Sequence, residues 1–179
     1  NPVVMDHIAE ARRAGAPLIV VDALRTRTGD AADRYISLRP GSEIALAWGL
    51  LWQLQRKNKV DLTYFLRRVH GIQDVRAEVA RWTPDEVQRV SDLTPTAVET
   101  LADLLAARRP AALLWAAGGT RDANAANSVR AFAILQLALG NIGVAGGGLL
   151  PIPEEGNAQG VSDMGLLCNS LPGYYGLEE

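Results

Sequence analysis

Two short runs of apolar residues constrain the fold of this chain more than any other feature. Residues 17–23 read PLIVVDA and residues 111–117 read AALLWAA. Each run is too short for a buried helix, and each leads into a loop that a helical pattern follows. A continuous apolar run of this length is typical of a strand that a parallel sheet buries on both faces. The two runs therefore predict strands over residues 17–22 and 111–116 at the centre of a parallel sheet.

Helical patterns fill most of the chain between and around these runs. Ser42 is expected to cap one helix, and Thr83 and Thr94, each followed by proline, are expected to start two others. Further patterns predict helices over 3–14, 61–69, 72–81 and 124–139, and a shorter strand over 33–38. The alternation predicts an α/β fold, a Rossmann-like parallel sheet with helices on both faces and a helical insertion in the middle.

The C-terminal part differs in composition, because residues 140–179 are rich in glycine and proline. These residues predict an irregular loop that faces a cofactor or packs against parts of a larger subunit. We therefore expect a domain over residues 1–150 and a Gly/Pro-rich loop over residues 151–179.

Charge and cysteine content exclude several classes of function. The 179 residues carry a formal net charge of −2, so there is no positive excess to bind a nucleic-acid backbone. Cys168 is the single cysteine, which rules out an internal disulfide or a multi-thiolate metal site within this segment. No apolar stretch approaches the roughly 20 residues of a membrane-spanning helix, so direct membrane insertion is not expected.

Polar residues follow the first apolar run, where a parallel sheet commonly binds ligands. Asp22 could accept hydrogen bonds from a ribose hydroxyl, or it could simply form a turn or cap a helix. Arg25, Arg27 and Thr28 could bind a phosphate, although a solvated loop would have the same composition.

Two further loops carry similar chemistry. The Gly118–Arg121 loop follows the second apolar run, and its glycines would let backbone N–H groups approach phosphate oxygens. It matches neither a P-loop nor a GxGxxG fingerprint. Gly41 and Glu43 lie in a tight turn whose carboxylate could bind a guanine edge, and the same acid could equally begin a helix.

The order of these motifs resembles the molybdopterin oxidoreductase family, which includes formate dehydrogenases, nitrate reductases and the large iron–sulfur subunit of NADH–quinone oxidoreductase. The matching stretches are GAPLIVVDALRTRT, ADRYISLRPGSEIALAWGL, PAALLWAAGGT, NSVRAFAILQLALGNIGVAGGGLLP and GNAQGVSDMGLLCNSLPGY. They extend from near the start of the chain to near its end.

The resemblance implies an internal domain of an oxidoreductase subunit that holds a guanosine arm of molybdopterin guanine dinucleotide. It places Asp22, Arg25, Gly41, Glu43, Gly118, Thr120, Arg121 and Asn157 at that cofactor, and it implies no catalytic or metal-ligating residue in this segment. Iron–sulfur clusters would lie on other parts of the subunit. Partners would be other domains and subunits of a cytoplasmic redox complex. The chain would contact the inner membrane only through that complex.

Three departures from the family pattern bear on the activity. Ala23 and Leu24 stand where such enzymes usually have Pro-Arg, so that Arg25 is displaced by one position. Glu43 replaces a usual Asp or Asn, and Pro153, followed by two glutamates, replaces an arginine near the metal of formate dehydrogenases. The departures favour the NADH–quinone oxidoreductase subunit, which supports electron transfer from NADH to quinone. The alternative is a formate dehydrogenase-like molybdenum enzyme. In either case the isolated chain is expected to hold no metal and to have no redox activity.

Overall fold

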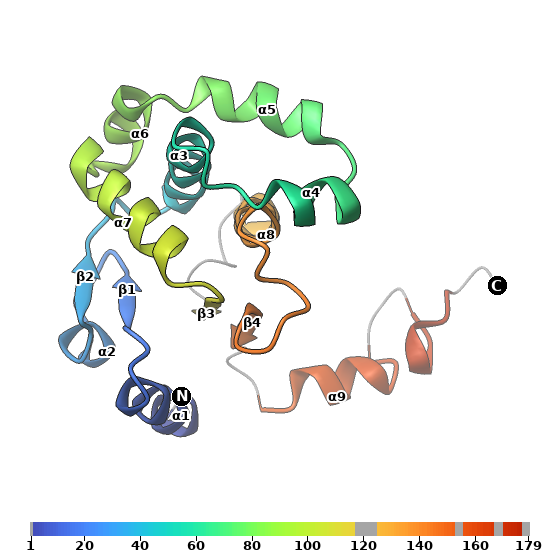
Figure 1. Ribbon diagram of the computed structural model, residues 1–179. Helices are drawn as coiled ribbons and strands as arrows, with labels where there is room; N and C mark the ends of the chain where they lie inside the picture. Colours follow the sequence, from blue (N-terminus) through green and yellow to red (C-terminus); the bar gives the residue numbers. More distant parts are fainter. Residues whose placement is uncertain (1, 117–124, 153–155, 167–169, 177–179) are drawn as a thin grey trace.

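A computed structural model describes residues 2–116, 125–152, 156–166 and 170–176 of the chain (Figure 1). The helices are α1 (Pro2–Arg13), α2 (Arg27–Asp30), α3 (Glu43–Arg56), α4 (Leu62–Arg68), α5 (Ile72–Arg81), α6 (Pro84–Ser91), α7 (Pro95–Ala107), α8 (Ala125–Ala138) and α9 (Ala158–Asp163), with a 3₁₀ turn η2 (Pro172–Tyr174). The strands are β1 (Ile19–Val21), β2 (Arg34–Ile36), β3 (Ala112–Ala116) and β4 (Gly148–Ile152).

The four strands form two parallel pairs. β1 pairs with β2, with Val20 opposite Tyr35, and β3 pairs with β4, with Leu114 opposite Leu150. The predicted α/β class and the parallel pairing are confirmed, and α4 to α6 form the helical insertion. The predicted single sheet is not seen, because within the described residues each pair is a separate two-stranded sheet.

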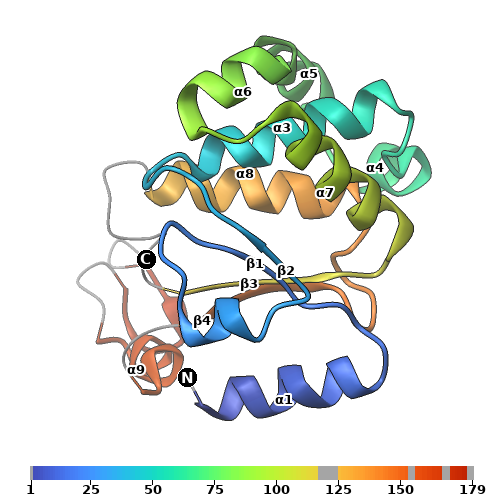
Figure 2. The ribbon, with the colours of Figure 1, turned by 90° about the vertical axis from the view of Figure 1, so that its left-hand side faces the viewer.

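The strands lie between two helical layers of unequal depth. Figure 2 shows α1 and α2 on one side of the strands and α3, α7 and α8 on the other. The core lies in the second layer, around α3, which packs against α5, α6, α7 and α8. A Cβ at Gly49 of α3 would lie only 2.8 Å from Cγ2 of Val87, so glycine permits the close approach of α6. α3 buries eight of its 14 residues, which lie around most of its circumference.

The strands are less buried than their sequences predict. All of β1 is only half-buried, and in β3 Ala112 and Leu114 are exposed. Leu114 is 37% exposed and its neighbour Leu150 is 48% exposed. The prediction that both apolar runs are buried on both faces is therefore wrong for the chain as it stands. Within the part of the chain that the structure describes, β1 and β3 each have a neighbouring strand on one edge only, so no strand covers their side chains from the other edge.

Two of the three predicted helix caps are present in the structure. The hydroxyls of Thr83 and Thr94 accept hydrogen bonds from the backbone N–H groups of Glu86 and Ala97, and proline occupies the first turn of both helices. Ser42 precedes α3 but does not cap it, because its Oγ donates to the backbone carbonyl of Arg39 at 2.5 Å. That bond holds the preceding turn closed.

The C-terminal part is more regular than its composition predicts. β4 contains a glycine and Pro151, both of which favour a loop, yet it pairs with β3 along its whole length. A proline fits an edge strand, because the N–H that it lacks has no neighbour to pair with. β4 extends across position 150, where the sequence predicts a domain boundary. That boundary stays a prediction.

A pair of buried amides joins α8 to the starts of β3 and β4. Nε2 of Gln136 donates to the carbonyl of Ala111 at 2.8 Å and to the carbonyl of Gly148 at 2.7 Å. Its Oε1 accepts from Nδ2 of Asn141 at 2.8 Å, and Oδ1 of Asn141 accepts from the N–H of Ala111 at 3.3 Å. Gln136 and Asn141 are each only 1% exposed. Both N–H hydrogens of the Gln136 amide therefore bond to carbonyls of the two strands, which fixes the distance between the starts of β3 and β4.

Replacing Gln136 by leucine is expected to lower the free energy of unfolding by about 3 kcal/mol or more. The substitution leaves two buried carbonyls and the Asn141 amide without their partner, and each orphaned group costs about 1–3 kcal/mol. Urea denaturation followed by circular dichroism measures the change. Gln88→Leu on the exposed surface of α6 is the matched control, and an equal loss in both variants would contradict the assignment.

A surface ion pair attaches α1 to the start of β1. Arg12 donates to both oxygens of Asp33, at 3.1 Å and 2.7 Å, and Oδ2 of Asp33 also accepts from the N–H of Leu18 at 2.7 Å. These bonds, first of all the side-chain bond from Arg12, lower the pKa of Asp33 below its ordinary value of 3.8. α1 contributes no fully buried residue, and this ion pair ties its last turn to the residue before β2.

The stability that Asp33 supplies is expected to depend on pH. Because its pKa is lowered in the folded state, the contribution is present above the unfolded pKa and is lost as pH falls through the folded pKa. Asp33→Asn should therefore lower the urea midpoint at pH 7, and the difference from wild type should vanish at low pH. Asp6→Asn, on the exposed surface of α1, is the control. A difference that persists unchanged in acid would argue against the ion pair.

Candidate functional site

Asp22 follows β1 directly and shapes the turn at its carboxyl end. Its backbone N–H donates to the carbonyl of Ile36 at 3.1 Å, which continues the pairing with β2. Its Oδ1 accepts from the N–H of Leu24 at 3.1 Å. The turn-forming role considered from the sequence is therefore present. The side chain is exposed, so it is also accessible to a ligand at this edge.

Arg25 lies against the neighbouring strand and helix. Its Nε donates to Oδ1 of Asp30 at 2.8 Å, and its guanidinium carbon lies 5.5 Å from the ring centroid of Tyr35. The Tyr35 hydroxyl donates to the backbone carbonyl of Asp22 at 2.9 Å. Tyr35 therefore contacts both predicted residues of this loop, and Arg25 is held in one place without being buried.

Sequence reasoning missed Tyr35 and the helix beside it. α2 begins after Thr26, whose hydroxyl accepts from the N–H of Gly29 at 3.5 Å. The Thr–x–x–Gly spacing is a weak local signal for this cap. Tyr35 could be found only from the register of β2 against β1, in which it lies opposite Val20.

Gly41 and Glu43 form the second predicted loop. Gly41 has φ +79°, a left-handed conformation that glycine adopts without strain. Its N–H donates to Oε1 of Glu43 at 3.3 Å, and Glu43 is the first residue of α3. A carboxylate here is favoured by the positive end of the helix. The acid therefore does begin a helix, as one of the two interpretations of the sequence expected.

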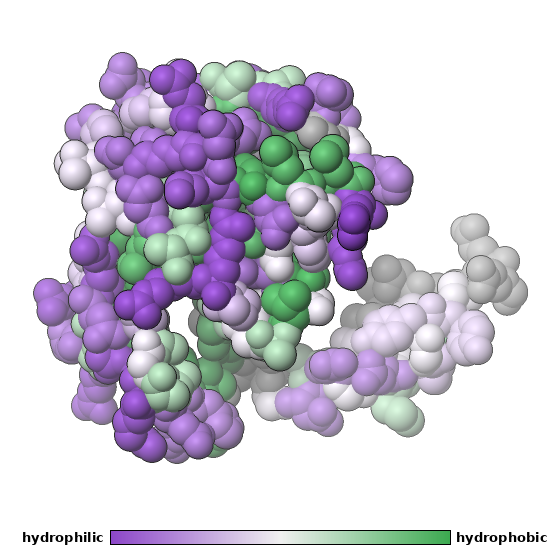
Figure 3. Space-filling model, in the orientation of Figure 1, coloured by the Kyte–Doolittle hydropathy of each residue, from purple (hydrophilic) through white to green (hydrophobic). Residues whose placement is uncertain are grey.

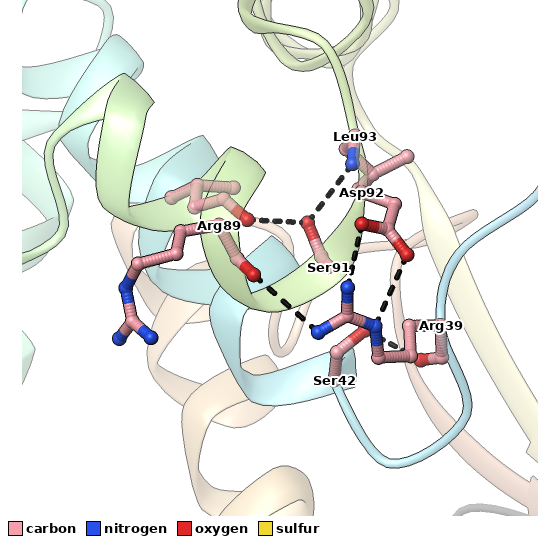
Figure 4. Close-up of polar contacts among 7 residues, drawn as sticks. Arg39, Ser42, Arg89, Ser91, Asp92 and Leu93 are labelled. Carbon is pink, nitrogen blue, oxygen red and sulfur yellow. Dashed lines mark hydrogen bonds and ion pairs between the residues drawn. The ribbon is translucent and has the colours of Figure 1, made fainter.

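An ion pair from the helical layer supports this second loop (Figure 4). Arg39 donates to both oxygens of Asp92, at 3.0 Å and 2.7 Å, and its backbone N–H donates to the carbonyl of Ser91 at 3.0 Å. Ser91 is fully buried and donates its hydroxyl to the carbonyl of Val87 at 2.7 Å. The loop before α3 is thus tied to the C-terminal end of α6.

The structure places the described predicted loops on the same side of the molecule. Figure 2 shows that the loop after β1, the loop after β2 and the starts of α3 and α8 all lie at the edge where the strands end. Asn157, with φ +59°, is exposed at the start of α9, which lies toward the same edge. Gly118, Thr120 and Arg121, like Pro153 and Cys168, lie outside the described residues.

The described residues contain no group of three or more His, Cys, Asp or Glu side chains that could hold a metal ion. Over the same residues, no helix has the length and apolar character needed to cross a membrane. His7 and His70 are both exposed.

Comparison with known proteins identifies formate dehydrogenases as relatives of this chain. Formate dehydrogenase H of Escherichia coli is 32% identical over 97% of the chain and 24% of its own length. The formate dehydrogenase-O major subunit of Escherichia coli is 30% identical over 97% of the chain and 23% of its own length. The formate dehydrogenase major subunit of Haemophilus influenzae is 26% identical over 97% of the chain and 22% of its own length. The chain therefore spans about a quarter of the length of these relatives.

Among solved structures, acetylene hydratase from Pelobacter acetylenicus has a similar fold, with a TM-score of 0.75 and 23% identity over 79% of this chain and 20% of that one. No family profile matches the chain. The formate dehydrogenases among these proteins are oxidoreductases, and they correspond to the second alternative from the sequence. They do not support the first alternative, the NADH–quinone oxidoreductase subunit.

Gly41→Ala is expected to destabilise the second loop. An L-residue in the left-handed region costs about 1–2 kcal/mol, so the urea midpoint should fall by a corresponding amount. Gly156→Ala provides the control, because Gly156 has no positive φ and a Cβ there would meet nothing within 4 Å. If both alanine variants unfold at the same urea concentration, the backbone of Gly41 is not constrained as described.

Proposed function

We propose that this chain is the nucleotide-cofactor domain of a formate dehydrogenase-like molybdenum oxidoreductase. The observation that supports this most strongly is the sequence similarity to formate dehydrogenases, which covers 97% of the chain at up to 32% identity. The α/β fold with parallel strands agrees with it. Formate would be the substrate of the complete subunit, and other domains of that subunit would supply the metal ligand and the iron–sulfur cluster.

The ligand we propose for this domain is a guanosine arm of molybdopterin guanine dinucleotide. The donor set fits such a group. Asp22 and Glu43 offer carboxylate acceptors to ribose hydroxyls and to the N–H groups of a guanine edge. Arg25 offers a guanidinium to the phosphates, and the start of α3 adds the positive end of a helix. When bound, the cofactor would supply the two-electron chemistry, which no residue of this chain provides.

The residues of this chain would bind and orient the nucleotide at the edge of the strands. Asp22 is exposed and is fixed by the Leu24 N–H, so it would present its carboxylate in a set direction. Arg25 is restrained by Asp30 and Tyr35, so less conformational freedom would be lost when it meets a phosphate. Glu43 is held by the Gly41 N–H at a turn that Arg39 and Asp92 anchor. These contacts support a pre-organised binding edge.

The full-length subunit provides the test. Asp22→Ala and Glu43→Ala should each weaken cofactor binding by about 10- to 100-fold, because a hydrogen bond to a charged group is worth about 1.5–3 kcal/mol. Molybdenum content and released guanosine monophosphate, both measured per subunit after purification at low cofactor supply, report occupancy. Formate-dependent reduction of a viologen dye reports activity.

Asp85→Ala, on the exposed first turn of α6, is the matched control and should retain the cofactor. Molybdenum without guanine in the wild-type subunit would contradict the guanine dinucleotide form. Molybdenum and guanine without formate oxidation would contradict the substrate. Unchanged occupancy in both site variants would remove Asp22 and Glu43 from the binding edge.

A further inference from the structure

Among the described residues, the two strand pairs have unpaired edges that face each other. β1 pairs with β2 along one edge, and β3 pairs with β4 along one edge. Figure 1 shows β2, β1, β3 and β4 in this order across the molecule, so that β1 and β3 are the inner strands. Neither inner strand is hydrogen-bonded to the other, since each belongs to a separate two-stranded sheet.

An opening separates the two pairs. Figure 3 shows the gap in the molecular surface between the α1–β1 part and the β3–β4 part. A pocket of about 540 Å³ lies at the amino ends of the strands, lined by the end of α1, the turn that leads to β1, Asp33 before β2 and Arg108 before β3. The pocket therefore marks the end of the gap at which β1 and β3 begin.

The backbone of β1 is oriented for a second neighbour. The carbonyl of Leu18 accepts from the N–H of Arg34, and the N–H of Asp22 donates to Ile36, so residues 18 and 22 face β2. Successive residues of a strand direct their backbone groups to opposite edges, so Ile19 and Val21 face the opening.

The connections of the chain determine where an additional strand would fit. Figure 2 shows α1 and α2 on the same side of the strands. Crossovers between parallel strands are right-handed in about 98% of cases. Two right-handed crossovers whose helices lie on the same side of a sheet move across it in the same direction. Because the chain passes from β1 through α2 to β2 on one edge of β1, a strand that leads through α1 into β1 must lie on the opposite edge, at the opening. α1 also begins on the side where β1 ends, as a crossover helix from a parallel strand does.

We propose that the opening receives a fifth strand, supplied by the segment of the complete subunit that leads into α1, which pairs in parallel with both β1 and β3. The relatives provide the chain for it, since this domain accounts for only 24% of formate dehydrogenase H. The resulting strand order is β2–β1–new strand–β3–β4. This is the order 3-2-1-4-5 of a doubly wound sheet, in which ligands bind where the order reverses. The reversal lies between the new strand and β3, so the binding edge is incomplete without that strand.

A second copy of this chain is a poorer occupant. Two copies related by a two-fold axis would join identical edges in antiparallel fashion, and that would fill one inner edge only. A single extended segment satisfies β1 and β3 at the same time and converts two marginal strand pairs into one sheet.

Hydrogen exchange of the full-length subunit at single-amide resolution tests the proposal without a mutation. The Asp22 amide, bonded to Ile36 at 3.1 Å, is the internal control. With the fifth strand in place, the amides of Ile19 and Val21 should exchange within about tenfold of Asp22. The segment directly before Asn1 should contain alternating protected amides of the same stability.

Exchange of Ile19 and Val21 about 100-fold or more faster than Asp22 would overturn the proposal, because the edge would then be open to water. Protection that disappears on dilution would also overturn it, in favour of a second copy. Protected Ile19 and Val21 beside a freely exchanging segment before Asn1 would overturn the choice of segment. The proposal is supported only if Ile19, Val21 and the segment before Asn1 are all protected and this protection does not depend on the protein concentration.

Discussion

The arrangement of helices and strands depends on the hydrogen bonds of the buried Gln136 side chain. It spans from α8 to the carbonyls of Ala111 and Gly148, at the beginnings of β3 and β4. Because both carbonyls bind one planar amide, the two strands start at a fixed spacing. Asn141 fixes the amide in turn, and it also receives the N–H of Ala111. The helical layer and the strand layer are thereby connected by polar contacts in a dry environment, where a missing partner is costly.

Local patterns in the sequence predicted local structure well. The apolar runs LIVV and ALLWA became β1 and β3, and Thr83 and Thr94 cap the helices that they precede. Gln136 could not be recognised in the same way, because a glutamine in a helical pattern usually lies at the surface. β4 was missed because Pro151 favours a loop unless the strand is known to lie at an edge. These misses share one cause: pairing between distant segments overrides the local preference.

The same distinction applies to the candidate site. Asp22, Arg25, Gly41 and Glu43 could be selected because they follow predicted strands or begin a predicted helix. Their side-chain partners are mostly local, with Leu24 for Asp22, Asp30 for Arg25 and Glu43 for Gly41. The supports that come from further away are Tyr35 for the first loop and the Arg39–Asp92 ion pair for the second, and no local pattern connects these residues. The burial of the apolar runs was overestimated for a related reason. An apolar run does not reveal how many strands will flank it, and within the described residues β1 and β3 each pair along one edge only.

The weak attachment of α1 has a consequence for how this domain unfolds. α1 buries no residue completely and is held by Arg12 and Asp33, whereas α3 lies at the centre of the helical core. We therefore expect α1 to open locally at a lower free energy than α3, whereas β1 packs against the core through Ile19 and Val21. A ligand that stabilises the β1 loop, to which α1 connects through the turn at Gly15, would oppose this opening in proportion to its occupancy. Proteolytic cleavage in the turn around Gly15, rather than global melting, is then the more sensitive measure of ligand occupancy.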